Sequence, residues 1–186
     1  VRQAYATAPD ARFIVHAGDL VNRAHADREW GEWFRAGGPI HAMVPSIPAP
    51  GNHEYRGYTE EEEEQDIERL SVFWRAQFTL PEHGAQTVDP ETNYYVDYQG
   101  VRIVVLNSDQ ERDGQAAWLE QVLSTNPNRW TIATHHHPIF SSASDRDNAN
   151  CARRGSRSTT GMVSTWCSRA TTTHTHAAGP RTWQTA

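Results

Sequence analysis

Three short polar clusters, each directly after an apolar run, constrain the fold of this chain more than any other feature. They are Gly18-Asp19, Gly51-Asn52-His53-Glu54 and His135-His136-His137-Pro138. Apolar runs of this length that stop abruptly are typical of buried strands. In open α/β sheets the ends of such strands meet at one edge, where ligands usually bind. We therefore expect an α/β domain that gathers metal-type ligands at a sheet edge.

The periodic segments between the clusters fit the same class. Strands are expected over 13–17, 43–47, 93–98, 101–106 and 129–134, and helices over 26–36, 59–77 and 114–123. Three prolines should turn the latter half of 43–47 into a loop. Gln99-Gly100 predicts a hairpin turn. The five glutamates at 60–64 are either a cation site or the solvated start of a helix, and the helix macrodipole favours the second interpretation.

Composition narrows the class of partner. A chain of 186 residues is long enough for one domain with its own core. A net charge of −6 argues against a nucleic-acid surface, and no apolar stretch is long enough to cross a membrane. The chain opens at Val1 without a methionine, which suggests the middle of a longer protein whose signal peptide, if there is one, lies upstream.

The last segment has a different character. From Cys151 onward there is no Leu, Ile, Phe, Tyr, Asp or Glu, and Ser, Thr and Arg are abundant. Such a segment cannot bury enough apolar surface to offset its ordering entropy. We therefore predict an unstructured tail over 148–186. Both cysteines, Cys151 and Cys167, fall in it, and no disulfide between them is predicted.

The residue types in the clusters suit a particular metal chemistry. The carboxylate of Asp19 has two oxygens and can bridge two cations, Asn52 offers an amide oxygen, and His136 offers an imidazole nitrogen. This set suits Zn, Mn or Fe and differs from a thiolate-type structural site. Two metals about 3.5–4 Å apart can activate a bridging hydroxide and neutralise a phosphoryl oxygen.

The neighbours of these residues have other roles and simpler alternatives. His53 can stabilise transition-state charge or protonate a leaving oxygen, and Glu54 can orient His53 or a ligand. A lone Gly-Asp is usually only a turn, and a lone His before Pro is usually structural. Because strand neighbours alternate faces, His135 and His137 should lie on the face opposite His136. Asn and His together in a Pro-rich loop, however, have no packing rationale.

Taken in order, the clusters resemble the motifs of the calcineurin-like metallophosphoesterase superfamily. Within it, four further runs are similar to the purple acid phosphatase-like branch, over about residues 10–147. These runs are Phe78-Thr-Leu-Pro81, Tyr94-Tyr95-Val-Asp97-Tyr, Val105-Leu-Asn-Ser108 and Ala117-Trp-Leu-Glu120. The resemblance implies an α/β fold with a β-sandwich flanked by helices, incomplete at both ends, and a partial metallophosphoesterase domain over 1–147.

The resemblance also implies an activity. Members hydrolyse phosphate esters, here of the phosphomonoester type, with a dinuclear centre of Fe, Zn or Mn and a bridging hydroxide. By position Asp19 resembles the bridging aspartate, Asn52 and His136 the ligands of one metal, and His53 the histidine that assists the leaving group. The expected partner is a small-molecule phosphate ester, with no nucleic acid and no membrane. The family likeness favours a secreted or extracytoplasmic location.

Departures from the pattern leave a second hypothesis open. The purple enzymes carry Tyr where this chain has Asn22, so the iron-tyrosinate colour is not expected. The family's first Asp motif would lie upstream of Val1, and its final Gly-His-x-His is absent as written, because His174-Thr-His176 follows Thr173. The alternative is an inactive fragment with at most weak metal binding.

The tail has a second interpretation, which is the right gene read in the wrong frame. When its residues are back-translated and reread from each third base, they can give a strand that runs into the missing Gly-His-x-His. The coding DNA tests this interpretation. A one-base shift near residues 147–150 should restore an uninterrupted reading frame.

Overall fold

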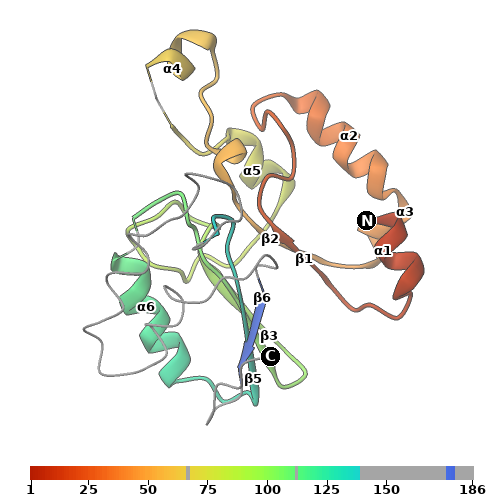
Figure 1. Ribbon diagram of the computed structural model, residues 1–186, viewed down its shortest axis with the longest axis vertical. Coiled ribbons are helices and arrows are strands. Elements are labelled where there is room, and N and C mark those ends of the chain that lie inside the picture. The colour runs from red at the N-terminus through yellow and green to blue at the C-terminus, as the bar shows by residue number, and fades with distance from the viewer. Residues whose placement is uncertain (66–67, 112, 139–174, 179–186) are drawn as a thin grey trace. The chain divides into compact units, whose positions relative to one another are not determined.

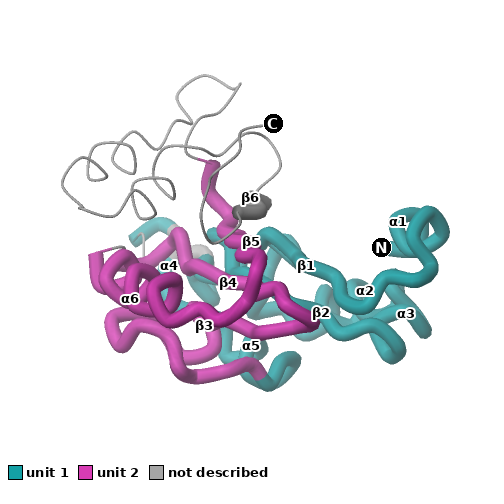
Figure 2. The backbone as a smooth tube through the Cα atoms, turned by 90° about the horizontal axis from the view of Figure 1, so that it is seen from below, with its two compact units in different colours: residues 1–79 teal, residues 80–186 magenta. Residues whose placement is uncertain are grey.

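The computed structural model describes residues 1–65, 68–111, 113–138 and 175–178 (Figure 1). The chain divides into two compact units, residues 1–79 and 80–186 (Figure 2). Both units combine helices with strands, so the expected α/β class is confirmed. None of the helices in the described part of the chain could span a membrane.

A pair of parallel strands organises the first unit. Its elements are α1 (Arg2–Thr7), β1 (Ile14–Ala17), α2 (Asp27–Gly37), α3 (Pro39–Met43), β2 (Ser46–Ala49), the 3-10 turn η1 (Asn52–Glu54), α4 (Glu60–Glu64) and α5 (Val72–Gln77). Ile14 lies opposite Ser46 and Ala17 lies opposite Ala49, so the two strands end level. Their following loops therefore leave the sheet at the same edge, as the sequence predicts.

Aromatic side chains on α2 and α5 form much of the core of this unit. Trp30 and Trp74 are fully buried. The Trp30 ring meets Phe78 edge-on with centroids 5.9 Å apart, and Trp74 meets Phe78 at 5.0 Å. The Trp30 indole donates to the carbonyl of Ala24 at 2.7 Å, which satisfies its buried N–H. These contacts fix the loop between β1 and α2 against the core.

The expectation of a strand from residue 43 is wrong. Residues Pro39–Met43 form α3, and the strand begins only at Ser46. Gly38 allows the turn into the helix at a φ of 57°, and Pro39 occupies the first helical position, where its missing N–H is harmless. Pro48 then lies inside β2 opposite His16, on a strand paired on one side only within the described residues.

The expectation of one helix over 59–77 is also wrong. The glutamate run is helical as predicted, in α4, but α5 begins anew at Val72. In the intervening segment the N–H groups of Arg69 and Ser71 donate to the carbonyls of Tyr55 and Glu54. These bonds to a distant segment compete with helical bonds. Ser71 then caps α5, since its hydroxyl accepts the N–H of Phe73 at 3.2 Å.

A mixed sheet and one long helix form the second unit. Its elements are β3 (Tyr94–Tyr98), β4 (Val101–Val105), α6 (Asp113–Ser124), β5 (Trp130–Thr134) and β6 (Thr175–Ala178), with strand order β3-β4-β5-β6. The predicted hairpin is confirmed, with Gln99 and Gly100 at φ of 45° and 83°. Four residues of β4, its end and α6 make a buried cluster, which consists of Val104, Leu106, Leu119 and Val122.

One strand lies inside the segment predicted to be unstructured. Residues Thr175–Ala178 form β6, which pairs antiparallel with β5. Both cysteines, and the tail apart from β6, lie outside the described residues. For those residues the unstructured tail and its frame-shift interpretation stay predictions.

An ion pair between a buried arginine and an exposed aspartate should support the second unit. The guanidinium of Arg102, with its side chain 5% exposed, donates to both carboxylate oxygens of Asp97 at 2.8 and 2.7 Å and to the carbonyl of Val122. It also lies 4.0 Å from the Tyr95 ring centroid. Hydrogen bonds from Arg102 lower the pKa of Asp97.

We expect Asp97→Asn to lower the free energy of unfolding by about 1–3 kcal/mol, because it leaves a buried guanidinium without its counter-ion. A lowered pKa means that the stabilisation is complete above the unfolded pKa of about 3.9 and is lost as the pH falls through the lower folded value. Urea denaturation from pH 7 to pH 3 measures both effects. Asp10→Asn, at an exposed carboxylate, is the control, and equal losses in the two variants would contradict the prediction.

A histidine on β1 should make the first unit sensitive to acid. Burial lowers the pKa of His16 from 6.5 to about 4, and the neighbouring His41 and the N-terminal ammonium add to this effect. The unfolded chain therefore binds more protons between these two pH values, and stability falls as the pH drops through that window. In His16→Phe the pH dependence of the melting temperature between pH 6.5 and 4 should flatten. An unchanged slope would refute the assignment.

Candidate metal centre

The loop after β1 holds its aspartate in an uncommon backbone conformation. Gly18 and Asp19 both have positive φ, 86° and 51°. Glycine adopts such values readily, but for a residue with a Cβ the left-handed region costs about 1–2 kcal/mol. Strain of this kind persists only where the surroundings enforce it, and it is common at functional sites. The conformation therefore needs a structural support.

The carboxylate of Glu54 provides that support. Its Oε2 accepts the backbone N–H groups of Asp19 at 2.9 Å and Gly51 at 2.7 Å, and its Oε1 accepts that of Leu20 at 2.9 Å. The residue is 1% exposed. Burial raises the pKa of Glu54 to about 7, while the three N–H donors act in the opposite direction. Glu54 thus ties the loops after β1 and β2 to each other and orients the predicted ligand Asp19 through its backbone.

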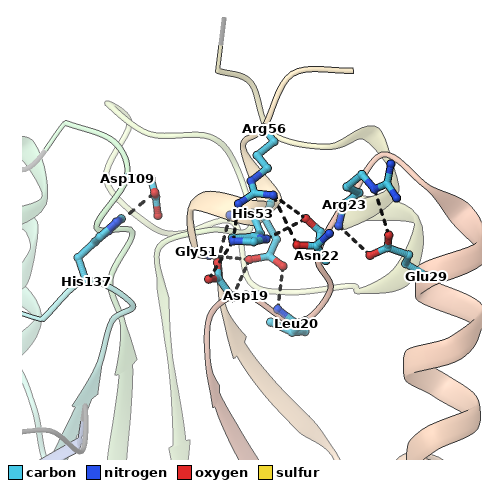
Figure 3. Close-up of polar contacts among 11 residues, drawn as sticks. Asp19, Leu20, Asn22, Arg23, Glu29, Gly51, His53, Arg56, Asp109 and His137 are labelled. Carbon is cyan, nitrogen blue, oxygen red and sulfur yellow. Dashed lines mark hydrogen bonds and ion pairs between the residues drawn. The ribbon is translucent and has the colours of Figure 1, made fainter. Parts of the chain in front are cut away.

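Asp19 and His53, two of the predicted residues of the first unit, lie together at this edge (Figure 3). The backbone N–H of His53 donates to Asp19 Oδ1 at 3.1 Å, and Nε2 of His53 lies 3.6 Å from Oδ2. Asn52, directly before His53, begins the turn η1. The Asp19 side chain is 32% exposed and that of His53 is 21% exposed, so solvent reaches both. The carboxylate of Asp19 and the imidazole of His53 are therefore neighbours, and the role of the Asn52 amide stays a prediction.

The ring of His53 is fixed at both nitrogens. Nδ1 lies 2.8 Å from the carbonyl oxygen of Asn22, and Nε2 lies 2.7 Å from a guanidinium nitrogen of Arg56 (Figure 3). Because a guanidinium can only donate, Nε2 must accept here and Nδ1 must carry the proton. The ring is neutral in this arrangement. Arg56 carries no role in the sequence analysis, and no local pattern identifies it, because its contact depends on the turn that η1 makes.

The histidine cluster belongs to the second unit. His135 is buried, and its Nδ1 lies 2.9 Å from the carbonyl oxygen of His137. His137 Nδ1 lies 3.0 Å from Ser108 Oγ and 3.8 Å from Asp109 Oδ1. The strand β5 ends at Thr134, so the expected alternation of faces does not extend to the histidines. His136, half-buried, contacts the His137 ring edge-on at 5.0 Å.

Ser108 and Asp109 are functional candidates that the sequence reasoning did not select. They follow the apolar run of β4 in the same way as the three chosen clusters follow theirs. The serine hydroxyl also accepts the backbone N–H of His137 at 3.0 Å, so the two residues hold the ring and the backbone of the histidine next to His136. The rule of a polar cluster at a strand end could have found them.

The donor atoms in the loops after β1 and β2, and those of the histidines after β5, are of types that fit a divalent or trivalent metal. Asp19 and Asn52 supply oxygens and His136 supplies a nitrogen, which are the ligand atoms that Zn, Mn and Fe accept. Among the residues described, no three or more His, Cys, Asp or Glu side chains are gathered into a metal-binding group. The roles of Asp19, Asn52, His53 and His136 therefore stay predictions.

Comparison with known proteins gives two findings. A family model described as calcineurin-like phosphoesterase matches residues 2–176. The fold is similar to that of purple acid phosphatase PPD1 from yellow lupin (Lupinus luteus) seeds, with a TM-score of 0.61 and 22% sequence identity. The match covers 77% of this chain and 26% of that chain, and at this identity it shows the fold alone. None of the curated protein sequences compared with the chain matches it.

The support from Glu54 gives a test of this site. In Glu54→Gln the amide NH2 would face backbone N–H groups that need acceptors, so we expect a loss of about 2–4 kcal/mol in the free energy of unfolding. Metal affinity, measured by titration calorimetry with Mn²⁺ or Zn²⁺, should fall about tenfold or more, because the backbone of Asp19 is released. Glu32→Gln, on the exposed face of α2, is the control. If Glu54→Gln unfolds at the same denaturant concentration as the wild type, the hydrogen bonds of Glu54 are not needed to hold the two loops.

Proposed function

The chain belongs to the calcineurin-like phosphoesterase family, and from this premise we propose that it hydrolyses small-molecule phosphate esters of the phosphomonoester type with a dinuclear metal centre. The observation that carries the proposal is the pairing of Asp19 with His53 at the level ends of β1 and β2. A possible metal ligand and a possible proton donor lie 3.6 Å apart there, in a conformation that Glu54 enforces. Structural turns do not require this combination.

In this proposal three residues would hold the metals. Asp19 would contribute to both ions, and Asn52 and His136 would hold one of them. Bound metals of this type supply a nucleophile at neutral pH and neutralise phosphoryl charge. The acceptable ions are Fe, Zn or Mn, since the ligands are oxygen and nitrogen atoms without a thiolate.

His53 would act on the ester itself. Hydrolysis forms a bond from a water oxygen to phosphorus and breaks the bond from phosphorus to the ester oxygen. The departing oxygen gains a proton, which a protonated imidazole can deliver from Nε2. Before that step the same edge of the ring can stabilise charge on the phosphoryl oxygens. The bond from Nδ1 to the carbonyl of Asn22 keeps the ring in the orientation that this requires.

The second candidate is a non-catalytic fragment that binds metal weakly at most. It is supported by the lack of a group of three ionisable or imidazole ligands within the described residues. The two candidates differ in metal content and in turnover.

The test is hydrolysis of p-nitrophenyl phosphate by the chain loaded with Fe, Zn or Mn, together with metal analysis of each sample. We expect turnover that chelation abolishes. Asp19→Asn should lose both metal and activity, whereas His53→Gln should keep its metal and lose about 100-fold or more in kcat. Asp27→Asn, exposed on α2, should behave as wild type. A chain that binds none of the three metals and shows no turnover would be the inactive fragment.

A further inference from the structure

Arg56 differs from its neighbouring arginines in its partners. Arg23, Arg28 and Arg69 pair with carboxylates, at 3.4, 3.6 and 2.6 Å. Within the described part of the chain, the side chain of Arg56 instead contacts the ring of His53 and the oxygens of Asn22, and no carboxylate pairs with it. A positive charge therefore lies at the predicted site without an anion of its own. The natural complement of such a charge is an anionic ligand.

The geometry of this guanidinium suits a phosphoryl group. One terminal nitrogen lies 2.7 Å from His53 Nε2, and the other lies 3.4 and 3.5 Å from the two oxygens of Asn22 (Figure 3). The two terminal donors of the planar fork thus point to different groups, one to the Nε2 edge of His53 that the proposed reaction uses and the other to the oxygens of Asn22. Guanidinium groups bind two oxygens of a phosphate in this way. The longer contacts to Asn22 are weak and easily exchanged.

We propose that Arg56 is a substrate-binding residue, which binds the phosphoryl oxygens of the ester and thereby releases Nε2 of His53. The inference rests on the phosphoesterase function proposed above. Before the ester binds, Nε2 accepts an N–H of Arg56 and keeps the guanidinium in position. The bond from Arg56 to the neutral ring uses one charge and one donor, whereas a phosphate dianion brings the opposite charge and accepts two donors of the guanidinium, so the dianion displaces the imidazole from Arg56. The released Nε2 of His53 takes up a proton from solvent and then faces the leaving oxygen as a proton donor.

The experiment uses inorganic phosphate as the probe and the metal-loaded chain as the protein. In Arg56→Gln, phosphate binding by titration calorimetry should weaken by about 10–100-fold, with KM for p-nitrophenyl phosphate raised to a similar extent and metal content unchanged. Arg56→Lys keeps the charge and loses the fork, so it should weaken binding by about 3–10-fold. Arg28→Gln, which removes an equal charge from the exposed face of α2, should stay within about twofold of wild type.

A second readout does not depend on turnover. The ¹⁵N shift of His53 Nε2 should move when phosphate is added to the wild-type chain, and it should already be displaced in Arg56→Gln without phosphate. Wild-type phosphate binding and KM in Arg56→Gln would overturn the role of Arg56 while leaving the hydrolase intact. A wild-type chain that neither binds phosphate nor hydrolyses the ester would overturn both proposals. Thermal melts establish whether the variants fold. If Arg56→Gln does not fold, the comparison is made with Arg56→Lys.

Discussion

The site depends first on one buried carboxylate. Glu54 accepts three backbone N–H groups from the two loops that follow β1 and β2, and one of these bonds holds Asp19 at a positive φ, which residues other than glycine adopt rarely. The contact between Asp19 and His53 depends on those loop positions. The position of Arg56 depends on the same arrangement, because Arg56 comes shortly after the turn η1. The Glu54 carboxylate therefore fixes the positions of the His53 and Arg56 side chains, with which it makes no hydrogen bond.

Much of the fold could be predicted from local sequence. The strands β1 and β5, which precede Asp19 and His135, were identifiable because polar residues follow apolar runs, and the hairpin because Gln99-Gly100 matches the twist of its strands. The break between α4 and α5 could not be predicted, since it results from bonds between Arg69 or Ser71 and a distant segment. The same limit applies to the candidate site. The residue types were readable, but the Glu54 bonds and the Arg56 contact exist only after folding.

The two units use buried charge in different ways. In the second unit Arg102 and Asp97 satisfy each other, and the pair serves packing between β3, β4 and the end of α6. In the first unit Glu54 is satisfied by backbone N–H groups, and Arg56 by a neutral ring and neutral oxygens. A pair that is already neutralised offers little to a ligand. A guanidinium held by neutral partners has a charge that an anionic ligand can still neutralise. For this reason Arg102 is assigned a structural role and Arg56 a substrate-binding role.

The level ending of β1 and β2 also limits which changes of length the protein can accept. Residues in a strand rise about 3.3 Å each, nearly the spacing expected between two metals in a dinuclear centre. Adding or removing one residue within either strand would shift Asp19 against Asn52 by that distance and would also reverse the face of every side chain beyond it. Insertions should therefore not be tolerated within 14–17 or 46–49. The register of β1 against β2 thus sets the position of Asp19 relative to Asn52. A library of single-residue insertions would show which positions tolerate a change of length.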